Sequence, residues 1–148
     1  MAAIENFLNP RYVSQLLNER LSVSEFCWSN IVVHDVQTIK ENIVHDYYNI
    51  VVAYAVSYVN NGLEHQAVIY CSAHSNDSRR QSMENLEFIW RKNIPGGQFL
   101  TNKPLFYESQ YGAMFYLGLS GDNLCQYFTT HSREEISSQL TSIAQWLA

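Results

Sequence analysis

The chain has 148 residues, of which 47% are hydrophobic, 14% aromatic and only 16% charged, and this composition excludes an intrinsically disordered protein. Nine basic and fourteen acidic residues give a net charge of −5 without any run of Lys or Arg, which argues against a nucleic-acid-binding protein. The sequence contains neither a signal peptide nor an apolar stretch of about 18 residues, so we expect a cytoplasmic protein that binds no membrane.

The three cysteines, Cys27, Cys71 and Cys125, are odd in number and far apart in the chain. No CxxC pair exists, so the sequence indicates neither a zinc knuckle nor a disulfide framework. The histidines are mostly isolated as well, whereas a metal site needs clustered ligands. We therefore expect buried free thiols in a reducing compartment and no metal ion.

A helix is expected within residues 1–24, the N-terminal helical segment. Asn9-Pro10 is typical of a helix start, with asparagine at the cap and proline at the first helical position. Apolar residues then recur at helical spacing up to Leu21. The helix should therefore end near residue 21.

Strands are expected next. The β-branched and aromatic residues of 25–39 predict one or two strands, and residues 44–49 should form a connection. The Asn-Gly pair at 61–62 then separates two β-rich runs, 49–59 and 64–72. Because both turn residues tolerate positive φ, this pattern predicts an antiparallel hairpin.

The hydrophobic period changes to that of a helix over residues 76–93. Its expected apolar face consists of Met83, Leu86, Ile89 and Trp90. Asp77 or Ser78 should cap this helix at its start. The Pro-Gly-Gly run at 95–97 should end it.

A second hairpin and a final helix complete the chain. Residues 104–107 and 112–119 are expected to be the arms of the hairpin, with Gly112 in the turn region. Ser132 and Glu135 have the spacing of a capping box, so the final helix should start at Ser132.

This order predicts an α+β fold, an antiparallel sheet of about five strands with a helix inserted between strands 3 and 4 and helices at both ends. We expect a single domain over 1–148, made of the helical segment 1–24, the sheet with its central helix at 25–119, and the final segment 120–148. No Gly, Asn or Pro closes the last helix, so two interpretations stay open: the chain is part of a longer protein, or it stands alone.

Three stretches of the sequence together resemble parts of a known protein family. They are "RRQSMENLEFIWRKNIPGG" at 79–97, "KPLFYESQYGAMFYLGLSGDNL" at 103–124 and "REEISSQLTSIAQWLA" at 133–148. In order and spacing they resemble the glutamate helix, the hairpin with the interlobe hinge, and the first large-lobe helix of protein-kinase-like phosphotransferases. The branch that they resemble most is that of the aminoglycoside and choline phosphotransferases, and the resemblance covers the amino-terminal (small) lobe.

The resemblance implies a nucleotide site. Leu117, Gly118 and Leu119 would present main-chain groups to an adenine edge, and Glu84 would be the helix glutamate, which in the family pairs with a strand lysine that touches the phosphates. That lysine is missing here, and its expected position is near Tyr70. The stretch "TIKENIVHDYYNIVVAY" also lacks the glycines of a phosphate-binding loop.

The large lobe would supply the catalytic base and the residues that hold magnesium. We therefore expect a nucleotide-lobe portion of a phosphotransferase-like protein that is not catalytically complete by itself and has no catalytic residue of its own. No cofactor is expected for this chain alone. ATP and magnesium are expected to bind only if a large lobe exists. The expected partner is that missing lobe or another protein.

Other interpretations stay open. Glu84 and Glu87 also suit a solvated helix face, and the Ser-Gly-Asp run at 120–122 also suits a plain turn. The chain is alternatively a non-enzymatic interaction domain that uses its aromatic-rich sheet to bind a protein. A third alternative is a small-ligand-binding α+β domain, which would need a strongly curved sheet.

Overall fold

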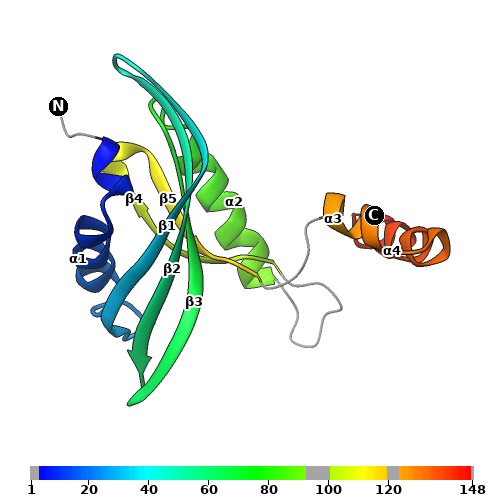
Figure 1. The fold of residues 1–148 in the computed structure, drawn as a ribbon, viewed down its shortest axis with the longest axis horizontal. Helices are drawn as coiled ribbons and strands as arrows, with labels where there is room; N and C mark the ends of the chain where they lie inside the picture. Colours follow the sequence, from blue (N-terminus) through cyan, green and yellow to red (C-terminus); the bar gives the residue numbers. More distant parts are fainter. Residues whose placement is uncertain (1–3, 93–100, 120–123, 148) are drawn as a thin grey trace.

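The computed structural model describes residues 4–92, 101–119 and 124–147. The fold is α+β, as predicted: one antiparallel sheet of five strands in the order β1-β2-β3-β5-β4, with a helix between β3 and β4 and helices at both ends (Figure 1). The strands are β1 (Ser29–Val44), β2 (Tyr47–Asn60), β3 (Leu63–His74), β4 (Lys103–Glu108) and β5 (Ala113–Leu117). The helices are α1 (Pro10–Leu21), α2 (Ser78–Lys92), α3 (Leu124–Thr130) and α4 (Arg133–Leu147), with 3-10 turns η1 (Ile4–Leu8) and η2 (Ser109–Tyr111).

Helix α1 begins and ends where the sequence predicts. The Asn9 side chain accepts hydrogen bonds from the main-chain N–H groups of Arg11 and Tyr12, and Pro10 occupies the first helical position. These contacts satisfy two of the N–H groups that every helix leaves free at its start.

The first hairpin is longer than predicted. β1 is one strand of 16 residues, and it pairs with β2 up to Val44 opposite Tyr47. The expected connection at 44–49 is therefore wrong, because only residues 45–46 form the turn. His45 takes a left-handed conformation with φ of 54°, and since histidine rarely supplies such a turn, the sequence pattern gave no signal for it.

The other two hairpins agree with the predictions. Asn61 and Gly62 have φ of 51° and 77° and join β2 to β3 through a two-residue turn, as primed turns require. β4 and β5 pair through η2, after which Gly112 has φ of 50°. An added Cβ at Gly112 would lie 2.6 Å from the His74 carbonyl oxygen, so only glycine fits there.

The start of α2 differs from the prediction. Asn76, not Asp77 or Ser78, provides the side-chain oxygen, which accepts a hydrogen bond from the Ser78 N–H at 3.1 Å. Asp77 has φ of 60° and turns its carboxylate towards Arg80 and Tyr107 instead. The predicted Pro-Gly-Gly end at 95–97 lies outside the described residues.

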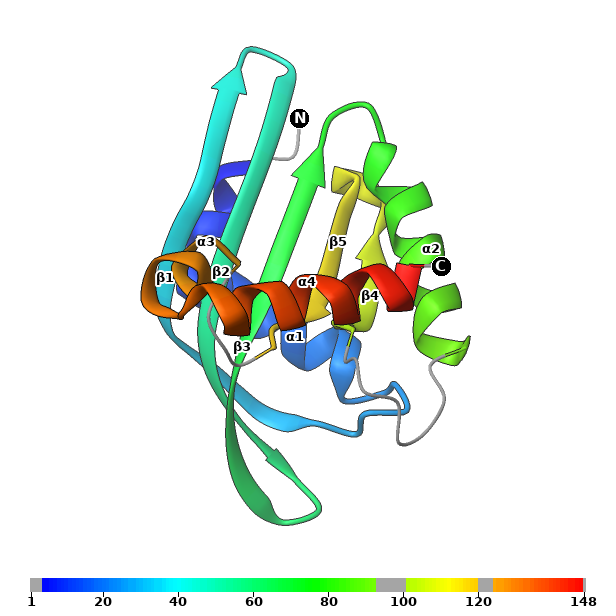
Figure 2. The same cartoon turned by 90° about the vertical axis from the view of Figure 1, so that its right-hand side faces the viewer.

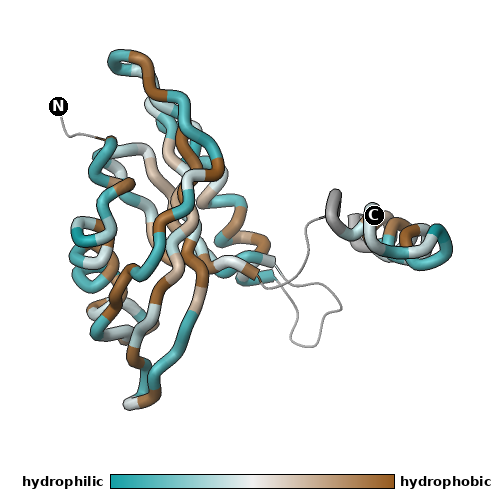
Figure 3. The backbone as a smooth tube through the Cα atoms, viewed as in Figure 1, coloured by the Kyte–Doolittle hydropathy of each residue, from teal (hydrophilic) through white to brown (hydrophobic). Residues whose placement is uncertain are grey.

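The two faces of the sheet are covered differently. α1 and η1 pack on one face and α2 on the other (Figure 1). The main core lies on the α1 side, where Phe7, Val13 and Leu17 pack against β2 and β3. Both hydrophobic and hydrophilic residues occur along the strands (Figure 3), and successive side chains point to opposite faces.

The C-terminal segment contains one helix that the sequence did not predict, α3. The predicted capping box of α4 is confirmed: the Ser132 N–H and hydroxyl both contact Glu135, and the Glu135 N–H donates back to Ser132. α3 and α4 stand on the α2 side of the sheet (Figure 2). No helix in the described part of the chain is long and apolar enough to cross a membrane.

Candidate functional site

A cavity of about 700 Å³ lies on the α2 face of the sheet, beside the segment Leu117–Leu119 that follows β5. We call this segment the hinge segment. The lining residues come from β1, β2, β3 and the hinge segment: His34, Ala55, Val56, Tyr58, Gln66, Ala67, Val68, Leu117, Gly118 and Leu119. The three residues that the sequence singled out for a nucleotide base therefore line one cavity together.

Strand pairing explains the apolar floor of this cavity. Ile69 and Cys71 belong to the core under α1, so alternation places Val68 and Tyr70 on the opposite face. Ala55 is directly opposite Val68 in the β2–β3 ladder, and the two side chains therefore share that face. Both are exposed in the structure, which leaves a flat apolar surface of small side chains next to the hinge segment.

The main chain of the hinge segment is partly occupied. The Gly118 N–H donates to the Val68 carbonyl at 2.7 Å, and the Leu117 carbonyl accepts from the Asn102 side chain at 3.1 Å. Within the described residues, no hydrogen bond engages the Gly118 carbonyl or the Leu119 N–H. These two groups belong to one trans peptide unit and point in opposite directions, so at most one of them can face a ligand in the cavity.

Gly118 and Tyr70 are packed against each other. A Cβ added at Gly118 would lie 2.8 Å from the Tyr70 ring and 3.0 Å from the Val68 carbonyl oxygen. The Tyr70 ring also stacks on Tyr116, with ring centroids 5.6 Å apart. The residue at the expected lysine position therefore supports the hinge segment by packing and brings no positive charge to the site.

Glu84, the expected helix glutamate, is exposed on α2. Its described contact is a hydrogen bond from Gln81 at 3.3 Å. The ion pairs in the described part of the chain do not include Glu84. The structure therefore places Glu84 on the same helix as predicted but does not bring it to the cavity lining.

Two polar side chains of the cavity were not predicted as site residues. His34 Nε2 lies 2.7 Å from the Ser57 hydroxyl, and Gln66 is opposite Ser57 in the β2–β3 ladder. The β1–β2 register shifts between Val33 and Asp35, so His34 is the extra residue of a bulge. A bulge redirects a side chain in a way that strict alternation does not reveal.

The titratable groups of the α1 face are shielded from water. Burial raises the pKa of the Cys71 thiol and of the Tyr54 hydroxyl, and the latter donates to the Phe7 carbonyl at 2.8 Å. A buried thiol with a raised pKa holds its proton and is a poor nucleophile. Cys27, by contrast, is exposed and does not share the predicted burial of the cysteines.

The lining of the cavity is mostly apolar, with a few polar groups at its edge. In residues 4–92, 101–119 and 124–147, no three His, Cys, Asp or Glu side chains lie close enough to hold a metal ion. Leu117–Leu119 offer main-chain groups, and His34 and Gln66 offer polar side chains. Apolar walls with a few polar groups are typical of small-molecule sites.

Comparison of the chain with protein-family models, with curated proteins and with solved structures finds no match in any of the three.

Proposed function

We propose that the chain is the nucleotide lobe of a phosphotransferase-like protein and is not catalytically complete by itself. The observation that carries the proposal is the position of the cavity, beside the hinge segment and on the α2 face of a five-stranded antiparallel sheet. A base would lie on Ala55 and Val68, with its edge towards the main chain of the hinge segment.

The order of elements supports the same proposal. A helix is inserted between β3 and β4, and β5 lies between these two strands in the sheet, so the residues after β5 return to the middle of the sheet. A lobe of this kind offers one wall of a nucleotide site, and a second lobe would close the site from the other side. That second lobe would also have to supply the base and the metal ligands.

Nucleotide-base binding is tested by titrating the 148-residue chain with adenosine and following backbone amide chemical shifts. We expect the shifts to concentrate at Leu117–Leu119 and at the paired positions Ala55 and Val68. Changes confined to other surfaces, or none at millimolar adenosine, would contradict the proposal. Inosine is a matched control, because its altered ring edge changes the donor and acceptor pattern presented to the hinge segment.

The need for a second lobe is tested by the mass of the native polypeptide in its source cells. A mass of roughly two to three times that of the 17.1 kDa chain would support a missing lobe. Assay of that longer protein for phosphoryl transfer would follow. A native polypeptide of the same mass as this chain would remove the catalytic part of the proposal.

A second candidate function is protein interaction, and a different region favours it. Val44 and Tyr47 are exposed on the end of the β1–β2 hairpin, with 55% and 43% of their surface accessible. This end of the hairpin extends past the last β2–β3 pair, Asn49 with His74. Replacing Val44 and Tyr47 by serine should abolish capture of a partner protein and leave adenosine binding unchanged.

A further inference from the structure

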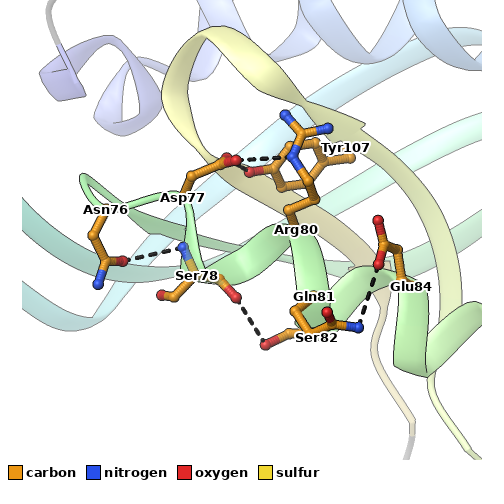
Figure 4. A network of polar contacts seen from close by, with 8 residues as sticks. All are labelled: Asn76, Asp77, Ser78, Arg80, Gln81, Ser82, Glu84 and Tyr107. Atoms are coloured by element: carbon orange, nitrogen blue, oxygen red, sulfur yellow. Dashed lines mark hydrogen bonds and ion pairs between the residues drawn. The ribbon is translucent and has the colours of Figure 1, made fainter.

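Arg79 is a partly buried arginine on α2. It lies in the first turn of α2, four positions before the buried Met83, so both side chains are on the helix side that faces the sheet. Its neighbour Arg80 points towards β4, where it pairs with Asp77 at 2.8 Å and lies over the Tyr107 ring (Figure 4). The two adjacent arginines therefore serve different environments.

The guanidinium of Arg79 has few partners in the protein. Its Nη2 lies 3.4 Å from the Asn49 side-chain oxygen on β2, which is a long contact to a neutral group. Its Nε is buried and has no hydrogen-bond partner among the described residues. The ion pairs in that part of the chain use Arg20, Arg80 and Arg91, and none of them involves Arg79.

An arginine in this state is energetically unfavourable. A guanidinium carries five N–H donors, and a donor that is buried without an acceptor destabilises the fold. A charge that is partly withdrawn from water without a counter-ion adds to this cost. Arg20 shows the usual solution, because it lies 2.5 Å from the buried carboxylate of Glu108. Arg79 lacks such a carboxylate in the described structure.

The described ion pairs bring no carboxylate to the Arg79 guanidinium. Asn49 is opposite His74 in the β2–β3 ladder, Ser72 is a buried hydroxyl on the same face, and the start of α2 carries the positive end of the helix dipole. Tyr116 is also near, since the Arg79 charge acts on its pKa against the raising effect of burial. These groups leave the positive charge uncompensated.

The lysines of the chain do not reach this place. Lys103 lies over the Phe26 ring at 4.4 Å and Lys92 over the Phe88 ring at 5.8 Å, while Lys40 is exposed on β1. Arg79 therefore places a positive charge of α2 on the face of the sheet where the cavity lies. Tyr116 connects the two places, because it stacks on Tyr70, whose ring touches the hinge segment.

We infer that Arg79 binds a phosphate group of the nucleotide whose base lies at the hinge segment, in place of the missing strand lysine. The inference rests on the proposed function for the source of the phosphate. The planar fork of a guanidinium matches two phosphate oxygens, and a phosphate would supply the acceptors and the negative charge that Arg79 lacks. The contact requires no magnesium.

The inference is tested by calorimetry without magnesium, with adenosine, ADP and inorganic pyrophosphate as ligands. For the unaltered chain we expect ADP to bind roughly tenfold more tightly than adenosine and pyrophosphate to bind weakly. In Arg79→Met, ADP and adenosine should bind equally and pyrophosphate binding should be lost. Arg91→Met, which removes an exposed arginine of the same helix, should behave as the unaltered chain.

A second variant tests the inference while keeping the arginine. Asn49→Asp places a carboxylate at the position that is 3.4 Å from the guanidinium, so it should occupy Arg79, raise the melting temperature and abolish the pyrophosphate effect. Pyrophosphate binding that persists unchanged in both variants would overturn the assignment of Arg79.

The outcomes separate the two proposals. Adenosine binding with no gain for ADP would overturn the role of Arg79 and leave the proposed nucleotide lobe standing. Pyrophosphate binding that depends on Arg79, without any adenosine binding, would support the phosphate contact and overturn the nucleotide as its source. Arg79→Met should be at least as stable as the unaltered chain; a clear loss of stability in urea would mean that the residue is structural and overturn the inference.

Discussion

Strands β2 and β3 present alternate residues to two different environments. On the α1 side, Tyr54, Ile69 and Cys71 are fully buried among apolar neighbours. On the α2 side, Ala55 and Val68 are exposed at a cavity, and a partly buried arginine has no ionic partner in the described structure. The α1 face of the sheet therefore supplies most of the stability, which allows the α2 face to carry an arginine whose buried Nε lacks an acceptor in the described structure.

The largest test of this comparison removes one apolar side chain from each face. Leu17→Ala should lower the free energy of unfolding by about 3 kcal/mol, because Leu17 is fully buried under α1. Val68→Ala, on the cavity face, should change it by less than about 1 kcal/mol. Urea denaturation measures both values, and equal losses would mean that the two faces contribute alike.

The next largest effect concerns ion pairs. Arg20→Ala would leave the Glu108 carboxylate buried without its partner. Because Arg20 is half exposed, the loss in free energy of unfolding should be smaller than for a fully buried pair, about 2 kcal/mol. Arg91→Ala, which breaks an exposed pair with Glu87 at 3.6 Å, should change stability by less than about 0.5 kcal/mol. Both values are measured by urea denaturation in low salt. A similar loss of stability in the two variants would show that the partly buried pair contributes no more than the exposed one.

A smaller effect is expected at the hinge segment. Gly118→Ala should destabilise the chain by about 1–2 kcal/mol through the overlap with Tyr70 and the Val68 carbonyl. The same variant should lose adenosine binding. Tyr70→Leu in addition should recover part of the stability, because the tyrosine ring is the nearer obstacle. A single variant that binds adenosine normally would show that the fit of Gly118 does not shape the site.

The smallest effect depends on pH. The hydrogen bond from Tyr107 and then the contact with Arg80 hold the pKa of Asp77 below its ordinary value of 3.8. A depressed carboxyl pKa gives stability that is present above pH 3.8 and is lost as the pH falls through the folded-state pKa. Tyr107→Phe should raise the pKa of Asp77 towards 3.8. Carboxyl NMR titration measures this change, and Arg80→Met should produce a smaller rise.

The local signals in the sequence predicted most of the fold. The Asn-Gly turn at 61–62, the cap at Asn9 and the capping box at Ser132 each depend on a few neighbouring residues. Such signals are readable from sequence because their physics is local. The turn at His45 was missed because its left-handed residue is an uncommon one for that position.

The candidate site was only partly predictable. The resemblance predicted that Leu117–Leu119 contact a base, which stays a prediction, and the sequence shows that β3 contains no lysine. His34 enters the cavity through a bulge, and Arg79 faces Asn49, thirty positions earlier in the chain. Neither relation exists within a sequence window, since each depends on how the strands and α2 are placed in space.

The insertion of β5 between β3 and β4 has a consequence for the order of folding. β1, β2 and β3 follow one another through two-residue turns, so their pairing needs little loop closure. β5 reaches β3 only after the whole of α2 has been passed, and such non-local pairing is slow. The hinge segment is thus anchored by the last strand to join the sheet, and we expect its amides to exchange hydrogen faster than those of β2. A ligand that holds the hinge segment to β3 would then stabilise the pairing of β4 and β5 with the rest of the sheet. Amide hydrogen exchange would become slower throughout β4 and β5.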